Sequence, residues 1–215
     1  MTAYKGNQKI ATVYHGGTLI KQIYKGETVV YRRAVIRTFA RTFTTNSSIS
    51  IPATATNIQC WLVGGGGGGG GFWYPNNVII GGGGGGAGGF SYKNYGASLA
   101  GTSQGITVGV GGAGTNAILG NGTGGGQSKF GTQTANGGGG GAYAGGAGAG
   151  GSASGGSTNT TGAAGGAGGG ILAGGSGATG TNIDGSVYGS GGNGYSGTNG
   201  SSGCCKITYS YIEYL

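Results

Sequence analysis

Acidic residues are almost absent from this chain, and the few that occur lie far apart. The 215 residues include three acids, Glu27, Asp184 and Glu213, and one histidine, His15. Hydrolysis of a glycosidic bond requires two carboxyl groups at one site. A Ser-His-Asp triad would depend on His15, which occupies a position that is lysine in two neighbouring repeats. The composition therefore predicts that the protein is not an enzyme.

Proline, cysteine and long apolar runs are also scarce, and each scarcity excludes a class of structure. With two prolines and no strict Gly-X-Y period, the chain is not a collagen. Three cysteines, Cys60, Cys204 and Cys205, form no even disulfide framework and lack the further ligands of a metal site. We expect them to be reduced, and we expect no metal or cofactor. No apolar stretch approaches the ~20 residues of a membrane span, and the polar segment 1–9 is unlike a signal peptide, so we expect no membrane insertion.

Glycine, by contrast, makes up 63 of the 215 residues. Large apolar side chains are concentrated in residues 1–63 and in the last dozen residues, so residues 64–203 must be ordered mainly by backbone hydrogen bonds. A flexible Gly/Ser linker is the alternative, because ordering each residue costs ~1–2 kcal/mol. The pure glycine runs 64–71 and 81–86 alternate with aromatic inserts, which linkers avoid. We therefore expect an ordered glycine-rich region.

Positive charge is concentrated near the start of the sequence. Eight of the eleven basic residues precede position 42, where Glu27 is the only acid, so the first 41 residues carry a net charge of +7. Such a segment can bind nucleic acid or lipid headgroups, form a solvated face, or dock on an acidic partner. We favour docking, and expect no nucleic-acid binding by the glycine-rich region, which contains no arginine. The candidate attachment residues are Lys5, Lys21, Lys25, Arg32 and Arg33.

A period of ten residues runs through the same segment. A tyrosine followed by lysine or histidine and then glycine recurs at Tyr4, Tyr14 and Tyr24. Short β-rich runs separated by glycine indicate a β-meander, and three such strands are near the minimum for a stable sheet. We expect residues 1–33 to form a small attachment module that completes its sheet by oligomerisation or docking.

Residues 34–215 are predicted to form a second domain, framed by β-strands. Alternating or apolar segments predict strands at 35–39, 48–51, 58–63 and 205–212. Between them, runs of glycine suit a polyproline-II-like conformation with three residues per turn, in which neighbouring passes bond to one another through their backbones. The predicted fold class is mostly β and irregular: a polyglycine-II helix bundle clasped by β-strands. The expected passes are 64–71, 81–89, 109–114, 120–126, 137–151, 162–170, 174–180 and 189–200.

Aromatic inserts between the glycine-rich passes are the predicted recognition residues. Aromatic loops on a rigid scaffold suit glycan stacking or protein docking. The alternative is that the rings cap the open ends of the glycine lattice. The candidates are Phe72, Trp73, Tyr74 and Asn76 in a first insert, Tyr92, Lys93 and Tyr95 in a second, and Asp184 and Tyr188 in a third.

The order of these features resembles a known family. Leu62-Val63 leads directly into the run 64–71, further runs follow, and the region ends at Ile207-Thr208-Tyr209. Over residues 43–211 the chain resembles the glycine-rich domain of bacteriophage tail-fibre and tail-tip proteins. It is also similar in style to the polyglycine-II tip adhesins of long tail fibres, although those adhesins have no N-terminal module like residues 1–33.

The resemblance implies a protein of the virion, often homotrimeric, that is assembled in the host cytoplasm and exposed on the particle. It implies attachment to other tail proteins, here through residues 1–33, and binding of a bacterial surface receptor, a glycan or an outer-membrane protein, through the inserts. The alternative is a purely structural virion protein without a host ligand, such as a head fibre, a decoration protein or a tail adaptor.

Overall fold

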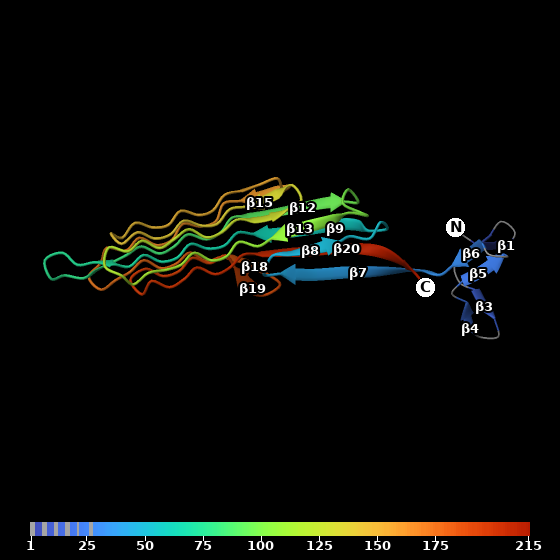
Figure 1. Cartoon of the computed structure of the whole chain (residues 1–215), viewed down its shortest axis with the longest axis horizontal. Coiled ribbons are helices and arrows are strands. Elements are labelled where there is room, and N and C mark those ends of the chain that lie inside the picture. Colours follow the sequence, from blue (N-terminus) through green and yellow to red (C-terminus); the bar gives the residue numbers. More distant parts are fainter. Residues whose placement is uncertain (1–2, 6–7, 11–12, 16–17, 21, 26–27) are drawn as a thin grey trace.

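The chain is built from β-strands joined by turns and extended segments. The computed structural model describes the backbone of all residues except 1–2, 6–7, 11–12, 16–17, 21 and 26–27, and the side chains from residue 33 onward (Figure 1). Within this described part there is no helix, and every strand pair is antiparallel. The prediction of a mostly β chain is therefore confirmed.

The first 32 residues contain six short strands, paired in chain order. The pairs are β1 with β2, β3 with β4, and β5 with β6, so each ten-residue repeat supplies two strands rather than one. Two-residue intervals separate the strands of each pair, a spacing typical of tight hairpins. The prediction of one three-stranded meander is wrong, since the described strands form separate hairpins. Their bounds are β1 Ala3–Lys5, β2 Gln8–Ile10, β3 Val13–His15, β4 Thr18–Ile20, β5 Gln22–Lys25 and β6 Thr28–Arg32.

Two five-stranded sheets form the centre of the remaining chain. The first has the strand order β17-β12-β9-β20-β7 and the second β16-β15-β14-β13-β8. The strands of the first sheet are β7 Ala34–Phe43, β9 Thr56–Val63, β12 Phe90–Gly96, β17 Thr158–Thr160 and β20 Cys204–Tyr214. Those of the second are β8 Ser47–Ser50, β13 Ser103–Thr107, β14 Ser128–Phe130, β15 Gln133–Ala135 and β16 Ala153–Ser154.

One apolar core joins the two sheets into a sandwich. Leu62 and Ile207 from the first sheet and Ile106 and Phe130 from the second are buried in the same cluster. Burial alternates along β9 and β20, as expected for strands with one face in the core. The strands predicted at β7, β8, β9 and β20 are all present. The insert at residues 90–95, predicted as a loop, is instead the strand β12 beside β9.

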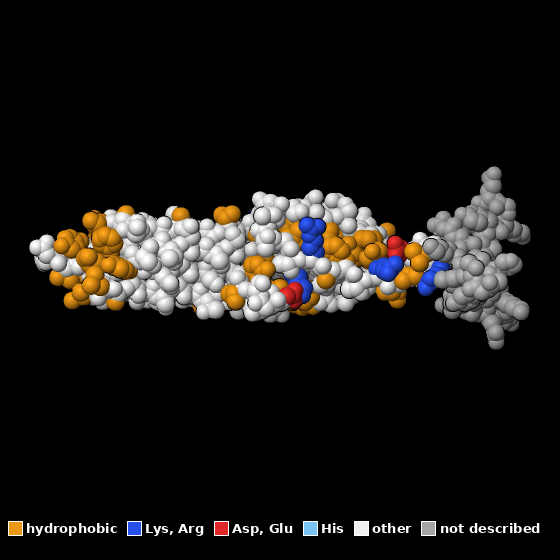
Figure 2. Space-filling view, turned by 90° about the horizontal axis from the view of Figure 1, so that it is seen from below, with side chains coloured by type: hydrophobic (Ala, Val, Ile, Leu, Met, Phe, Trp, Pro, Cys, Tyr) orange, Lys and Arg blue, Asp and Glu red, His pale blue; other side chains and the backbone are white. Residues whose placement is uncertain are grey.

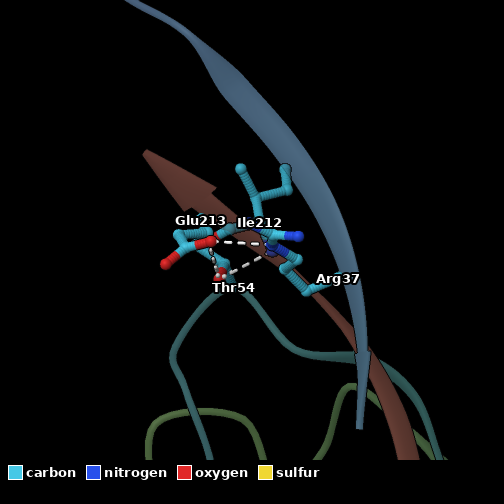
Figure 3. A network of polar contacts seen from close by, with 4 residues as sticks. All are labelled: Arg37, Thr54, Ile212 and Glu213. Carbon is cyan, nitrogen blue, oxygen red and sulfur yellow. Dashed lines mark hydrogen bonds and ion pairs between the residues drawn. The ribbon is translucent and has the colours of Figure 1, made fainter. Parts of the chain in front are cut away.

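Strands β7 and β20 continue beyond their sheet as a two-stranded ribbon. They stay paired as far as Tyr214↔Ala34, whereas β9 pairs with β20 only as far as Ser210. Arg37 Nε donates to Glu213 Oε2 across the ribbon at 2.8 Å (Figure 3). The Thr54 hydroxyl donates to the Ile212 carbonyl oxygen at 3.0 Å and accepts from the Ile212 N–H at 3.2 Å. Because the ion pair is exposed, we expect the hydroxyl contacts to contribute at least as much to holding this end.

The glycine-rich segments leave the sandwich side by side and run along the long axis of the molecule (Figure 1). The central pass, residues 64–71, follows directly from β9 and is buried throughout. Its N–H groups donate in rotation to three neighbouring passes, each of which is met at every third residue. The donor–acceptor pairs are Gly64, Gly67 and Gly70 with Gly89, Gly86 and Gly83; Gly65, Gly68 and Gly71 with Gly126, Thr123 and Gly120; and Gly66 and Gly69 with Ser201 and Thr198.

The carbonyl groups of the same pass accept hydrogen bonds from three other segments, also in rotation. These segments donate from residues 138 and 141, residues 112 and 115, and residues 192 and 195. The central pass is thus hydrogen-bonded to six neighbours, three through its N–H groups and three through its C=O groups. Every buried backbone group needs such a partner, and here the lattice supplies them without side chains.

The segments predicted as passes are extended and hydrogen-bonded to one another, and two of them differ from the prediction in their course. The segment predicted as one pass over 137–151 turns back on itself, where Ala142 N–H donates to the Gly146 carbonyl oxygen. The segment 189–200 also turns back, where Thr198 N–H donates to the Asn193 carbonyl oxygen. Composition could not reveal these turns, because the glycine content continues through them.

Candidate functional site

The end of the glycine-rich passes away from the sandwich includes three loops with large apolar side chains, residues 72–81, 115–120 and 169–174, together with Tyr195. The first loop runs from β10 (Phe72–Trp73) to β11 (Ile80–Gly81), two strands that pair with each other. Phe72 also forms a β-bridge with Ile118, and Ile80 forms one with Ile171. The Phe72 ring packs against Tyr195, with 6.1 Å between ring centroids. Segments that are distant in sequence are therefore joined into one surface, which we call the distal end.

Large apolar side chains are exposed over this distal end. Figure 2 shows them as an orange group at one extremity of the molecule. Of the twelve exposed large hydrophobic side chains in the described residues, seven lie here, with exposed fractions between 37% and 73%. The three loops and Tyr195 contain no charged residue. In other proteins, large exposed apolar patches often coincide with interaction surfaces. The seven are Trp73, Tyr74, Val78, Ile118, Leu119, Ile171 and Leu172.

The backbone of the distal end is held in conformations that bulky residues seldom adopt. Leu119, Leu172 and Tyr195 have φ values of 59°, 54° and 63°, and Asn76 and Asn77 are also left-handed. For leucine and tyrosine such angles are uncommon and costly. The surrounding bridges hold these residues in place, and strain of this kind concentrates at binding sites. The distal end is therefore a shaped surface rather than a loose chain reversal.

The first predicted group of recognition residues lies at this end. Trp73, Tyr74 and Asn76 are exposed on the first loop, and Phe72 is half-buried beneath them. Sequence analysis missed the residues from the other loops, above all the apolar pairs Ile118-Leu119 and Ile171-Leu172. Each pair stands alone among small and polar residues, and that isolation is the signal that could have identified it.

The second predicted group lies on strand β12, away from the distal end. Tyr95 is buried in the sandwich core, where its hydroxyl donates to the Phe130 carbonyl oxygen at 3.0 Å. Burial raises the pKa of Tyr95 above its ordinary value. Lys93 Nζ donates to Thr132 Oγ1 at 2.8 Å, and Tyr92 packs against Trp61 with 5.1 Å between ring centroids. The expectation that these residues lie on a loop is wrong, because residues 90–96 form the strand β12.

The third predicted group belongs to a hairpin on the outer face of the first sheet. This hairpin consists of β18 (Thr181–Ile183) and β19 (Ser186–Tyr188). Tyr188 packs beside a small buried cluster of Val63, Ile183 and Cys204. Asp184, at the turn, accepts a hydrogen bond from Lys206 Nζ at 2.6 Å. These residues are not brought together with Trp73 and Tyr74.

The predicted attachment residues fall mostly outside the described part of the structure. Lys21 and the side chains of Lys5, Lys25 and Arg32 lie outside it. Arg33 is half-buried, and its carbonyl oxygen accepts a hydrogen bond from the N–H of Leu215 at 3.0 Å. Arg33 thus lies where the ribbon of β7 and β20 begins.

The three cysteines are buried free thiols in the sandwich. Cys60 Sγ lies 3.6 Å from Cys205 Sγ, and burial raises the pKa of Cys60 well above its ordinary value. Burial, with smaller contributions from Cys205 and Asp184, raises the pKa of Cys204 to about 12. Among the described residues, no three His, Cys, Asp or Glu side chains are grouped as metal ligands would be, and no helix could span a membrane.

Comparison with known proteins identifies one family. The family pattern described as a glycine-rich domain matches residues 41–210. This range holds all the glycine-rich passes and the sandwich except most of β7 and the end of β20, and leaves out the N-terminal hairpins. No curated protein matches the chain.

Proposed function

This chain belongs to the glycine-rich domain family, and we propose that it is a bacteriophage tail-fibre or tail-tip protein that binds a receptor on the bacterial surface. The observation that carries the proposal is the distal end, where seven exposed apolar side chains lie on strained, cross-bridged loops without a charge. A monomeric protein seldom leaves such a patch exposed unless it binds something. The rigid passes below it hold the patch away from the rest of the molecule.

In this proposal the passes are polyglycine-II helices packed into a lattice. The support is the hydrogen-bond period: each neighbour of the central pass is met at every third residue, which is the repeat of a helix with three residues per turn. The glycines support the same geometry, because a side chain on any residue of the central pass would overlap a neighbouring backbone. Such a lattice gives a stiff, chemically inert shaft.

The receptor in this proposal is an outer-membrane protein rather than a glycan. Sugar-binding surfaces combine aromatic rings with groups that hydrogen-bond hydroxyls, whereas the distal end adds Val, Ile and Leu side chains to Trp73 and Tyr74. Aliphatic side chains suit the apolar loops of a protein partner. The N-terminal hairpins would attach the chain to other tail proteins, and a homotrimer on the virion fits this arrangement.

A structural virion protein without a host ligand is the second candidate. Ile36, Ile212 and Tyr214 are exposed on the ribbon of β7 and β20, so apolar surface also exists at the other end of the domain. A chain that joins two virion components would cover both ends. In that case the distal end would contact a neighbouring virion protein and no bacterium.

Binding of the purified protein to intact bacteria tests the proposal. We expect the Trp73→Ala/Tyr74→Ala variant to lose binding to a host strain, because both rings are exposed at the distal end and truncating central aromatic side chains typically removes most of an interface's affinity. The matched control is Tyr214→Ala, an exposed tyrosine at the opposite end, which should bind like the parent. Unchanged circular dichroism must accompany each result. Absence of binding by the parent protein to every host of the virus would favour the structural role.

A further inference from the structure

A hollow lies on the side of the sandwich, where the hairpin of β18 and β19 meets the outer face of the first sheet. It has a volume of about 450 Å³, within the range of small-molecule sites. The sheet and the hairpin contribute different chemistry to it: two aromatic rings and a lysine from the sheet, and polar groups from the hairpin. The lining residues are Trp61, Phe90, Lys206, Thr181, Asn182, Ile183 and Asp184.

The sheet fixes an aromatic floor. Trp61 on β9 is paired in register with Tyr92 on one side and Lys206 on the other, so all three side chains share one face. The Trp61 and Tyr92 ring centroids are 5.1 Å apart, and Lys206 Nζ lies 5.1 Å from the Trp61 ring centroid. Phe90 lies two residues from Tyr92 on the same face. Because these rings stand on central strands, their positions are set by the sheet and not by a loop.

The hairpin supplies hydrogen-bonding groups beside this floor. Asp184 has a φ of 52° at the turn and is 59% exposed in its side chain, while its Oδ1 accepts from Lys206 Nζ. Asn182 Oδ1 accepts from the Gly185 N–H at 3.0 Å, which holds the amide in place. Within the described residues, Asp184 Oδ2 and Asn182 Nδ2 form no hydrogen bond. One acceptor and one donor therefore remain unpaired on residues that line the hollow.

We propose that this hollow binds one neutral pyranose unit of a saccharide. The C–H face of a sugar ring packs on an aromatic ring, and a carboxylate and an amide hydrogen-bond its hydroxyls. The charge of Lys206 is matched by that of Asp184, so the site offers no net charge to an acidic ligand. The distal end lacks this combination of an aromatic floor with fixed polar groups. The inference does not rest on the proposed function, because the hollow and the distal end use different elements.

The two tryptophans of the chain allow a direct test. In a Trp73→Phe protein, Trp61 is the only tryptophan, and its fluorescence reports on the hollow. We would titrate this protein with the methyl glycosides of glucose, galactose, mannose and N-acetylglucosamine, and with glucuronate as the acidic probe. A saturable change with at least one neutral sugar is expected. The same sugar should leave the fluorescence of a Trp61→Phe protein unchanged, since Trp73 is at the distal end.

A carboxylate variant completes the test. Asp184→Asn in the Trp73→Phe protein should weaken the binding of that sugar about tenfold or more, as expected for loss of a hydrogen bond to a charged group. Glu213→Gln, the same change of carboxylate to amide on the ribbon, should have no effect. The absence of a saturable response to every neutral sugar, or a response to glucuronate alone, would overturn the proposal. A response that persists unchanged in the Asp184→Asn protein would overturn it as well.

Discussion

At the scale of single residues, the glycines of the central pass leave no room for a side chain. A Cβ atom on Gly67 would overlap the carbonyl group of Gly139, which belongs to a neighbouring backbone and cannot rotate away. Gly105 in β13 is different, since a Cβ atom there would meet nothing within 4 Å and its φ is not positive. The packing thus requires glycine at position 67, whereas a larger residue would fit at position 105.

We predict opposite effects of alanine at these two positions. Gly67→Ala should destabilise the protein by about 1–3 kcal/mol or more, because overpacking displaces a backbone that six neighbours hold. Gly105→Ala should be neutral or stabilising by up to about 1 kcal/mol, because alanine loses less backbone entropy on folding. Urea unfolding measures both. An equal, small effect of the two substitutions would show that the lattice yields to a methyl group.

Because the thiols are buried, the free energy of unfolding depends on pH in the alkaline range. The folded pKa of Cys204, about 12, lies above its ordinary value of 9.0, so the unfolded chain loses this proton first as the pH rises. The contribution of Cys204 to stability is therefore complete below pH 9.0 and is lost between pH 9.0 and about 12. Burial also raises the pKa of Cys60 and the pKa of Tyr209, and both shifts add to the loss of stability at alkaline pH.

Removing this thiol should flatten the alkaline stability profile. Between about pH 9 and 11, each such thiol lowers the free energy of unfolding by up to about 1.4 kcal/mol per pH unit. The Cys204→Ala protein should show a slope that is smaller than the parent slope by about that amount. Urea unfolding at several pH values gives both slopes. Parallel profiles for the two proteins would mean that Cys204 does not titrate differently in the folded state.

At the scale of elements, one serine joins the sandwich to the glycine-rich passes. Ser128 on β14 is buried, and its hydroxyl donates to the Val63 carbonyl oxygen at 2.7 Å, at the last residue of β9. Ser128 Oγ in turn accepts from the Gly109 N–H at 2.9 Å, where another pass begins. The Ser128 side chain therefore links the two points at which extended segments leave the sheets.

Replacing Ser128 should lower the free energy of unfolding by more than the loss of one small side chain would suggest. Ser128→Ala leaves a buried N–H and a buried C=O without partners, and we expect a loss of about 1–3 kcal/mol in the free energy of unfolding. Ser50→Ala, on the exposed face of β8, should change stability by less than about 0.5 kcal/mol. Thermal unfolding of both variants provides the comparison. A Ser128→Ala protein as stable as the control would show that water or a shifted backbone replaces the hydroxyl.

The elements also show what the sequence could predict. Alternation predicted β9 and β20, because one face of each strand is buried in the sandwich. β7 and β8 were also predicted, from short apolar segments. Alternation failed for β12, whose tyrosines and phenylalanine were interpreted as a recognition loop although Tyr95 belongs to the core. The two- and three-residue strands β14, β15 and β16 are too short to carry a period. Their positions depend on pairing with neighbours distant in sequence.

Part of the distal end could likewise be predicted from the sequence, and part could not. Trp73 and Tyr74 were predicted from one insert, because aromatic residues between pure glycine runs are conspicuous. Leu119 and Leu172 were not, since nothing local shows that their turns reach the same end as residues 72–80. That convergence follows from the order in which the passes pack, which the glycine runs themselves do not encode.

At the scale of the whole molecule, stability in the shaft comes from the backbone. The N–H groups of residues 64–71 all donate hydrogen bonds of 2.9–3.0 Å within a buried pass. Such groups exchange with solvent only when the surrounding lattice opens. Six neighbouring passes must separate before the central pass is exposed, so its opening should coincide with global unfolding.

Hydrogen exchange should therefore rank this glycine run among the most protected segments of the chain. Amides of residues 65–70 should exchange with the free energy of global unfolding, like the central strand β9, whereas the exposed Asn76 and Asn77 should exchange rapidly. Mass spectrometry of peptic fragments or amide-resolved NMR can measure the difference. Rapid exchange over residues 65–70, at rates typical of a glycine linker, would contradict a hydrogen-bonded lattice.

The crosswise direction of these hydrogen bonds has a mechanical consequence. The ends of β7 and β20 and the apolar loops lie at opposite extremities of the domain formed by residues 34–215, along the long axis (Figure 1). A pull between those extremities runs along the passes and loads their hydrogen bonds in shear, so many bonds share the tension and must break together. Rupture under force follows the unfolding rate and not the equilibrium stability. The glycine-rich passes should thus resist a force along their axis far better than a force that pulls one pass sideways from its neighbours and breaks the bonds one at a time.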